Sequence, residues 1–207
     1  FDPNGLKAGN TVTIDFWNPS KNGRYIVYGI SEGGTEMSTL YIKEVAENNN
    51  LDEKITNCRN SVTRWLPDES GFFYTRNPRP GTVPKNEEHL HTKVYFHKLG
   101  DNPETDPLIF GDQRPKDDMI GLSLSIDGRY LAISVAKTWT ENEIYLYDHQ
   151  TKALRLLITS IPAKFSLIFL QDKILLKTNY QANNQRILWT SFSDLDQPVD
   201  QWKEFIP

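Results

Sequence analysis

Long hydrophobic runs are absent from this 207-residue sequence, and no window approaches the roughly 18 apolar residues that a membrane-spanning helix needs. The first residues, FDPNGLKAGN, lack the basic and apolar regions of a secretory signal peptide. These two absences predict that the protein has no membrane partner. They also favour a cytoplasmic location, with the periplasm as the alternative that stays open.

Cysteine and clustered positive charge are scarce as well. The single Cys58 cannot form an internal disulfide and no activating motif surrounds it, so it is expected to be a small buried hydrophobe. Lys and Arg number 23 against 27 Asp and Glu, and the basic residues are scattered along the chain. Nucleic acid is therefore not expected as a partner.

Helical periodicity is also missing, and short runs rich in β-branched and aromatic residues take its place. These runs predict an all-β fold, because clusters of Gly, Asn, Asp and Pro that favour tight turns separate them. Two polar stretches, Glu47–Lys54 and Arg76–Glu88, are predicted as a turn region and an exposed loop. The predicted strands are Arg24–Ile30, Thr39–Val45, Gly71–Arg76, Lys93–Leu99, Tyr130–Ala136, Glu143–His149, Lys173–Asn179 and Arg186–Phe192.

One pattern of strands and turns repeats along the chain. FWNPSKNGRYIVYGI from Phe16, RWLPDESGFFYTR from Arg64 and LSLSIDGRYLAIS from Leu122 each combine an apolar strand, a polar turn that closes on Gly, and an aromatic-rich strand. LIFLQDKILLKTN from Leu167 is a degenerate fourth copy. Such a unit cannot bury its sheet faces alone, so neighbouring copies must stack around an axis.

The spacing of the copies is that of propeller blades. Gly23, Gly71, Gly128 and Asp172 mark equivalent positions at steps of 48, 57 and 44 residues, close to the roughly 40–50 residues of a four-stranded blade. The chain is therefore predicted to be one domain, a partial β-propeller of about four blades with four antiparallel strands each. The predicted domain covers residues 1–207, with blades at about 10–50, 58–110, 118–160 and 164–207.

Three of the four histidines, His89, His91 and His97, lie within nine residues. In an uninterrupted strand alternate side chains share a face, so these three would point the same way and could hold a metal. No cysteine or carboxylate pattern accompanies them, and Val94–Phe96 reads as part of a strand. The sequence therefore predicts hydrogen-bonded or solvated histidines and no metal site.

The ordered set of these segments resembles the propeller domain of prolyl oligopeptidases, serine peptidases that cut short peptides after proline. FDPNGL resembles the start of that propeller, and SKNGRYIVYGISEGGTEMSTLYI its first blade. GFFYTRNPRP with HLHTKVYFHKLGDNP resembles the second blade, and LSIDGRYLAISV the third. LKTNYQANNQRILWTSF with QWKEFIP resembles the fourth. The resemblance covers essentially the whole chain, and it implies that no metal or other cofactor is used.

The same resemblance implies what the chain lacks. The family's propeller has seven blades and accompanies an α/β-hydrolase domain with a Ser-Asp-His triad, whose nucleophile lies in a Gly-x-Ser-x-Gly turn. No strand-turn-helix elbow of this kind is expected in the sequence; the stretch around Ser123 and Ser125 fails the glycine spacing and belongs to a hairpin. The chain is therefore expected to have no catalytic residues and to be inactive alone.

Three loops are implied as functional by the resemblance. Tyr180, Gln181, Asn183 and Asn184 match a loop that helps to line the substrate cavity, and an ordinary polar surface hairpin is the alternative. Several relatives place a basic residue and a Pro in this loop, so Gln181 and Asn183 give no support for an ionic substrate contact.

The other two implied loops contain one aromatic residue each. Phe110 matches a residue that makes an apolar substrate contact, with a propeller-core aromatic as its alternative. Trp139, in Ala136–Glu143, matches a mobile interdomain loop and is expected to meet the hydrolase domain. Packing between its own strands is the competing explanation for Trp139.

Two functions stay open from the sequence. The first is the non-catalytic propeller portion of a prolyl-oligopeptidase-like serine peptidase, which gates the access of short Pro-containing peptides to a hydrolase domain. Its partners would be that hydrolase domain, the remaining blades and the peptide. The second is a stand-alone propeller scaffold that binds a protein or peptide. In either case, raw blade faces at the two ends of an open arc are expected to favour self-association.

Overall fold

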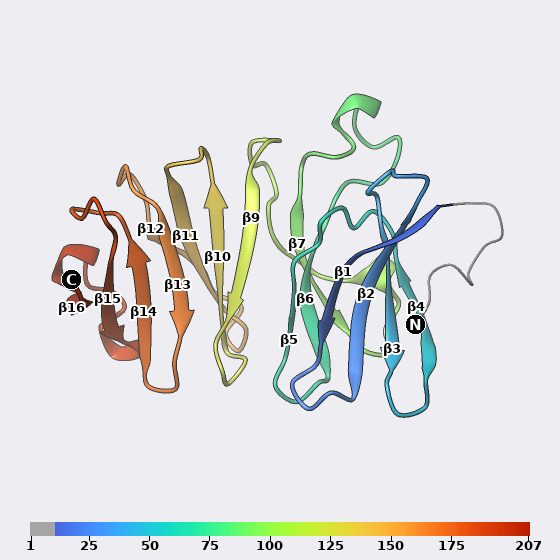
Figure 1. Ribbon diagram of the computed structural model, residues 1–207, viewed down its shortest axis with the longest axis horizontal. Coiled ribbons are helices and arrows are strands. Elements are labelled where there is room, and N and C mark those ends of the chain that lie inside the picture. Colours follow the sequence, from blue (N-terminus) through green and yellow to red (C-terminus); the bar gives the residue numbers. More distant parts are fainter. Residues whose placement is uncertain (1–10) are drawn as a thin grey trace. The chain divides into compact units, whose positions relative to one another are not determined.

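The structure, a computed structural model, describes residues 11–207. The described residues form four four-stranded antiparallel sheets (Figure 1), which confirms the predicted all-β fold. The chain divides into two compact units, residues 1–117 and 118–207. The segment FDPNGL, which resembles the start of the propeller, lies outside the described residues.

Unit one contains the first two sheets, in which consecutive strands are hydrogen-bonded neighbours. The first sheet consists of β1 (Val12–Pro19), β2 (Tyr25–Glu32), β3 (Thr39–Glu44) and β4 (Asn49–Ile55). The second sheet consists of β5 (Thr63–Trp65), β6 (Gly71–Arg76), β7 (Lys93–Lys98) and β8 (Leu108–Phe110). Short 3₁₀ turns, η2 (Lys85–Glu87) and η3 (Pro103–Thr105), lie in the loops on either side of β7.

Unit two repeats this arrangement with the third and fourth sheets. The third sheet consists of β9 (Met119–Leu124), β10 (Tyr130–Ala136), β11 (Asn142–Asp148) and β12 (Leu154–Ile158). The fourth consists of β13 (Phe165–Phe169), β14 (Lys173–Thr178), β15 (Arg186–Ser191) and β16 (Lys203–Ile206). The turns η4 (Phe192–Asp194) and η5 (Val199–Gln201) connect β15 to β16. No helix among residues 11–207 is long and apolar enough to cross a membrane.

All eight strands predicted from the sequence are present, with ends that differ by no more than two residues. The predicted turn region Glu47–Lys54 is wrong, because most of it belongs to β4. This outermost strand of the first sheet is largely exposed and polar, so it lacks the apolar residues by which the other strands were found. The loop prediction for Arg76–Glu88 holds from Asn77 onward.

Each unit has a hydrophobic core between its two sheets. In unit one, Val27 and Leu40 of the first sheet pack with Trp65, Phe72 and other apolar side chains of the second. Cys58 is fully buried in this core, as predicted, and burial raises the pKa of its thiol to about 12. In unit two, β13 packs against β9, β10 and β11. The core there is larger and contains Ala132, Ile144, Leu146, Ile158, Phe165, Leu167, Phe169, Ile174, Leu176, Leu188, Leu195, Val199 and Trp202.

The repeated turn of the sequence recurs as a repeated set of hydrogen bonds. The backbone N–H of Tyr25 donates to the Ser20 hydroxyl at 3.0 Å, and the N–H of Tyr130 donates to the Ser125 hydroxyl at 2.8 Å. The backbone N–H of each serine in turn donates to the carbonyl of the same tyrosine, at 2.8 Å in both turns. The turns into β2 and β10 are therefore the same structure in the first and third sheets.

An ion pair fixes each of these turns to the next strand. Arg24 bonds Glu44 on β3 at 3.1 Å, and Arg129 bonds Asp148 on β11 at 2.9 Å. The Asp148 side chain is mostly buried, and hydrogen bonding to Arg129 lowers the pKa of its carboxyl from 3.8 to about 2. Asp148 also accepts backbone hydrogen bonds from the turn that follows β11.

The repeat predicts that Gly71 is glycine because it closes a tight turn, but the structure gives a different reason. The left-handed residue of its turn is Glu69, with a φ of 61°, and Gly71 itself lies in β6. An added Cβ at Gly71 would lie 2.3 Å from the backbone oxygen of His97 on the neighbouring β7. Close approach of two strands, rather than a positive φ, therefore requires glycine here.

We expect Gly71→Ala to destabilise the protein by about 1–3 kcal/mol or more, because the clash is with backbone held in the β6–β7 ladder. Gly121→Ala on β9 is the matched control, since its Cβ would meet nothing closer than Ser134 Cβ at 3.8 Å. Urea unfolding of both variants measures the difference. Equal stability of the two variants would contradict the steric explanation.

The Arg129–Asp148 pair predicts a pH dependence of stability. Because the folded-state pKa of Asp148, about 2, is lower than its ordinary value of 3.8, the pair stabilises the fold above about pH 4. This stabilisation is lost as the pH falls through 4 toward 2. Asp148→Asn should therefore be less stable than the parent at pH 7, and the difference should shrink steadily in unfolding curves taken from pH 5 to pH 2. A difference that does not change with pH would show that the charge of Asp148 is irrelevant.

Candidate functional site

Two of the loops implied by the sequence meet at one residue of unit two. These are the β10–β11 loop, which carries Trp139, and the β14–β15 loop, which carries Tyr180. The backbone N–H of Lys164 donates to the Asn179 side chain at 2.7 Å, and the Lys164 ammonium donates to the Trp139 carbonyl at 3.0 Å. Lys164, which directly precedes β13, thus connects both loops.

A buried asparagine, Asn142, connects the third and fourth sheets at the point where the Trp139 loop enters β11. The Asn142 amide donates to the Ser134 hydroxyl at 2.7 Å and to the Phe165 carbonyl at 2.9 Å, and its oxygen accepts from the Phe165 N–H at 2.7 Å. The first residue of β13 therefore has both backbone groups paired with a side chain of the neighbouring sheet. This fixes the position of Lys164, the residue before it.

A cavity of about 350 Å³ opens beside this junction. Its walls come from the end of β10, the start of β13 and the end of β14, all within unit two. Two lysines, Lys164 and Lys177, line it, and no Asp or Glu does. The remaining lining residues are Ser134, Ala136, Asn142, Phe165, Ser166, Thr178 and Gln185.

The implied substrate residues of the β14–β15 loop do not line this cavity. Tyr180 is half-buried against the core of unit two, and its hydroxyl accepts a hydrogen bond from Gln181 at 3.1 Å. The Arg186 guanidinium lies 5.9 Å from the centre of the Tyr180 ring. Asn183 and Asn184 are exposed at the tip of the loop. Their roles toward a substrate stay predictions, and the residue of this loop that lines the cavity is Gln185.

Trp139 and Phe110 differ sharply in their surroundings. The Trp139 side chain is 84% exposed, so packing between its own strands does not account for this residue. Phe110 ends β8 in unit one and is only 6% exposed, with the Arg114 guanidinium 5.5 Å from its ring centre. Burial of Phe110 fits its structural alternative, a core aromatic, and a substrate contact by this residue stays a prediction.

The three clustered histidines do not share a strand face. His89 and His91 lie in the loop before β7, and only His97 is part of the strand. His91 has a φ of 54° and pairs with Glu87 at 3.0 Å, whereas His97 is buried and pairs with Asp106. Within residues 11–207 no group of three His, Cys, Asp or Glu side chains is arranged to hold a metal ion.

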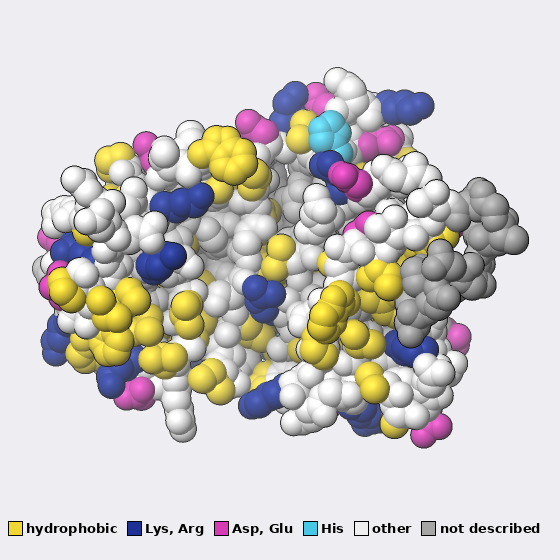
Figure 2. Space-filling view, viewed as in Figure 1, with side chains coloured by type: hydrophobic (Ala, Val, Ile, Leu, Met, Phe, Trp, Pro, Cys, Tyr) yellow, Lys and Arg dark blue, Asp and Glu magenta, His cyan; other side chains and the backbone are white. Residues whose placement is uncertain are grey.

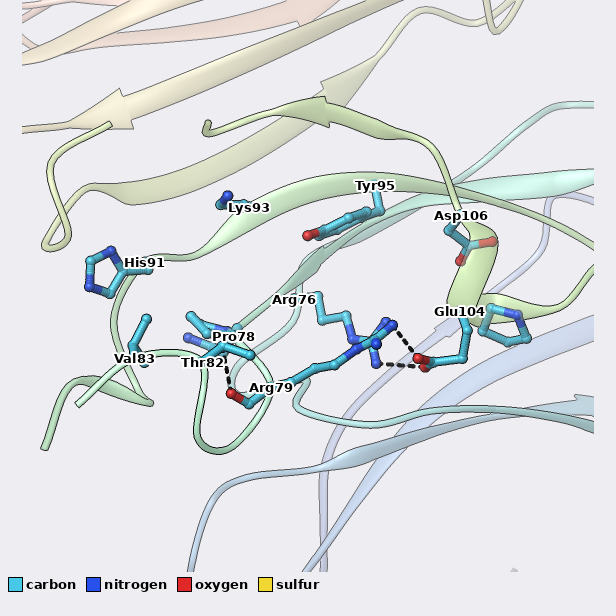
Figure 3. A pocket seen from close by; sticks show the side chains of 12 residues that line it. Arg76, Pro78, Arg79, Thr82, Val83, His91, Lys93, Tyr95, Glu104 and Asp106 are labelled. Atoms are coloured by element: carbon cyan, nitrogen blue, oxygen red, sulfur yellow. Dashed lines mark hydrogen bonds and ion pairs between the residues drawn. The ribbon is translucent and has the colours of Figure 1, made fainter. Parts of the chain in front are cut away.

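A second cavity, of about 420 Å³, lies in unit one between the β6–β7 loop and η3. Figure 3 shows the guanidinium groups of Arg76 and Arg79 directed at the carboxylate of Glu104. The Arg76 side chain is 6% exposed and also donates to the Thr56 carbonyl at 3.0 Å. Both arginines that line this cavity thus already bind a carboxylate that lines it too.

A buried hydrogen-bond network supports the floor of the unit-one cavity. The Tyr74 hydroxyl donates to Asp106 at 2.8 Å, and His97 Nδ1 lies 3.0 Å from the same carboxylate. Burial and the nearby carboxylate raise the pKa of Tyr74, so its hydroxyl stays protonated as a donor. This network is internal to the second sheet and reads as structural.

We expect Tyr74→Phe to lower the free energy of unfolding by about 1–3 kcal/mol, because it removes a buried hydrogen bond to a charged acceptor. Tyr95→Phe is the control, since Tyr95 stacks on Tyr74 from the adjacent position of β7 and its hydroxyl bonds no described residue. Chemical denaturation of both variants provides the measurement. A loss as large for Tyr95→Phe would remove the support for the network.

Comparison with known proteins places these features in one family. The model of the prolyl oligopeptidase N-terminal β-propeller domain matches residues 1–207. The chain is 32% identical over 209 residues to a prolyl endopeptidase of Elizabethkingia meningoseptica, and the match covers 99% of this chain and 29% of the relative. It is 28% identical over 233 residues to prolyl oligopeptidase A of Amanita bisporigera, covering 100% of this chain and 30% of the relative.

Solved structures agree with the sequence matches. A chain from a structural and mechanistic study of two prolyl endopeptidases superposes with a TM-score of 0.90 at 26% identity, and the match covers all of this chain and 30% of that one. The apo form of prolyl oligopeptidase B from Galerina marginata gives a TM-score of 0.83 at 23% identity, which supports the fold alone. The chain therefore spans about three tenths of the length of the relatives that it matches.

Proposed function

The chain belongs to the prolyl oligopeptidase family, of which it is part of the N-terminal β-propeller domain, and from this premise we propose that it gates a peptidase. In this proposal it admits short Pro-containing peptides to a hydrolase domain elsewhere in the same protein and keeps longer chains out. The observation that carries the proposal is the match of the propeller model to the whole chain, next to relatives called prolyl endopeptidases.

The chemistry of the chain fits a non-catalytic role. The one Gly-x-Ser-x-Gly stretch of its sequence, Gly29–Gly33, has its serine, Ser31, buried in β2 and paired with Thr13 of β1, so it is not the strand-turn-helix elbow of a nucleophile. A nucleophilic serine also needs a histidine oriented by an acid. Among residues 11–207, the buried pair His97–Asp106 is completed by Tyr74 rather than by a serine. Hydrolysis would therefore have to come from another part of the protein.

The loop end of unit two is the surface that we assign to the hydrolase domain. Trp139 is exposed there, and aromatic residues in that setting are typical of interface anchors. The cavity lined by Lys164 and Lys177 opens beside it. A peptide entering between the two domains would meet both features.

The remaining blades would cover the outer face of the fourth sheet. Ile168, Leu175 and Trp189 lie side by side across β13, β14 and β15, and Ile168 is 52% exposed. Figure 2 shows hydrophobic side chains gathered over this sheet with Lys and Arg side chains beside them. A solvent-exposed stripe of this kind is typical of a sheet face that a neighbouring blade covers.

A chimera tests the gating role. This chain would replace the 209 matched residues of the Elizabethkingia meningoseptica prolyl endopeptidase. We expect the chimera to cleave a short Pro-containing peptide and to leave a peptide of about 40 residues with the same Pro site uncleaved, as measured by chromatography of the products. Trp139→Ala should weaken this size discrimination, because it removes the exposed anchor.

Two outcomes would contradict the gating proposal. A folded chimera that cleaves long and short peptides equally well lacks a gate. A folded chimera without activity on either peptide, together with full activity of the unaltered relative, favours the stand-alone scaffold. The isolated chain is the blank and should give no hydrolysis above buffer.

A further inference from the structure

We infer that the cavity of unit two is a binding site for a peptide carboxylate. That the carboxylate belongs to a peptide rests on the proposed function, whereas the affinity for an anion rests on the cavity itself. Among the residues that line the cavity are the two lysines, Lys164 and Lys177, and the polar residues Ser134, Thr178 and Gln185.

The positive charge of the cavity is not neutralised from within. The Lys164 ammonium bonds a backbone carbonyl, which carries no net charge. Lys177 forms no ion pair with any described residue, and no carboxylate lines the cavity. A carboxylate is the protein-derived group that satisfies two ammonium groups at once. The unit-one cavity differs, since Glu104 already binds its two arginines.

An acidic side chain of the neighbouring strand β11 is held away from the cavity. Glu143 follows Asn142 on β11, so its side chain points to the opposite face of the third sheet. It pairs with Lys137 at 2.7 Å and accepts a hydrogen bond from Thr159 at 3.0 Å. Glu143 is therefore committed to another pocket, which Lys137 and Thr159 line.

Two hydroxyl groups of the cavity are left as donors by their other bonds. The Ser134 hydroxyl accepts from the Asn142 amide at 2.7 Å, and the Thr178 hydroxyl accepts from the Tyr180 N–H at 3.0 Å. Each hydroxyl has one proton to donate and no described acceptor for it. Hydroxyl donors and lysine ammonium groups both suit the acceptor-only chemistry of a carboxylate.

The site is also held in place before any ligand arrives. Lys164 is fixed by its N–H bond to Asn179, and Phe165 beside it is fixed by Asn142. Lys177 lies on β14 directly opposite Ser166 of β13, so its backbone is part of the sheet ladder. A preformed site loses less entropy on binding. A volume of about 350 Å³ accommodates a single residue rather than a longer segment.

Three peptides of the same length and with one Pro test the inference on the 207-residue chain. The first has an internal Glu and both ends blocked. The second has Gln in its place and a free C-terminal carboxylate, and the third has Gln and both ends blocked. Binding is measured by calorimetry and by NMR shifts of the chain at low salt. We expect at least one acidic peptide to bind about five- to tenfold more tightly than the neutral one, and 0.5 M NaCl to remove the difference.

Lysine variants locate the effect. Lys164→Gln and Lys177→Gln should each reduce the preference for the acidic peptide several-fold, and the double variant should abolish it. Lys203→Gln is the matched control, because Lys203 is an exposed lysine of the same sheet that does not line the cavity. Circular dichroism of each variant verifies folding. Whichever of the two acidic peptides the chain binds more tightly, the Glu peptide or the peptide with the free C-terminus, identifies the kind of carboxylate that is bound.

Equal binding of the three peptides by the parent chain overturns the inference, and so does a preference that survives in the folded double variant. Failure of the proposed function has a different signature. In that case the chimera loses size discrimination while the isolated chain still prefers an acidic peptide and loses this preference with Lys164 and Lys177.

Discussion

A four-stranded sheet has two faces and cannot bury either of them by itself, and the rest of this structure depends on that constraint. In unit one the faces of the first and second sheets meet in a single core that includes Val27 and Phe72. In unit two the third and fourth sheets also meet in one apolar core. Hydrogen bonds across this contact add to it, because the Asn142 side chain pairs with both the N–H and the carbonyl of Phe165. These hydrogen bonds fix the position of one sheet on the other, because a buried amide that makes three hydrogen bonds tolerates only one arrangement. The cavity and its two loops lie at the end of the core where this contact is made.

The repeated turn made the fold predictable from sequence. Ser, Gly, Arg and Tyr recur at fixed positions in the first and third sheets because each has a local partner, such as the Ser125 hydroxyl for the Tyr130 N–H. Local partners leave a signal in the sequence. The outer strand β4 left none, since its side chains are mostly solvent-exposed and its place is set by pairing with β3. Gly71 shows a third case: its residue type was read as part of a turn, but the atom that requires glycine belongs to His97, far along the chain.

The candidate site was predictable only in part, for a similar reason. The resemblance implied the loops of Trp139 and Tyr180, and these loops do meet, through Lys164. The lysines themselves gave no signal. Lys177 occupies a polar position of an alternating strand, which indicates a solvated side chain, and only its pairing with Ser166 brings it to the cavity. Gln181 and Asn183 suggested a loop without ionic contacts, yet the positive charge is present a few residues away, on the strands that carry the loop.

The two cavities show how charge distinguishes a structural site from a site for a ligand. Moving the Arg76 guanidinium out of water costs free energy, and this cost is offset within unit one because Glu104 pairs with Arg76 as well as with the more exposed Arg79. A ligand would have to break those contacts before making its own. In unit two Lys164 and Lys177 are exposed and pair with no carboxylate of the cavity, so a ligand carboxylate would break no ion pair. The free energy gained per contact is modest and depends on salt, which is the behaviour that the proposed gate would need in order to let peptides pass as well as bind.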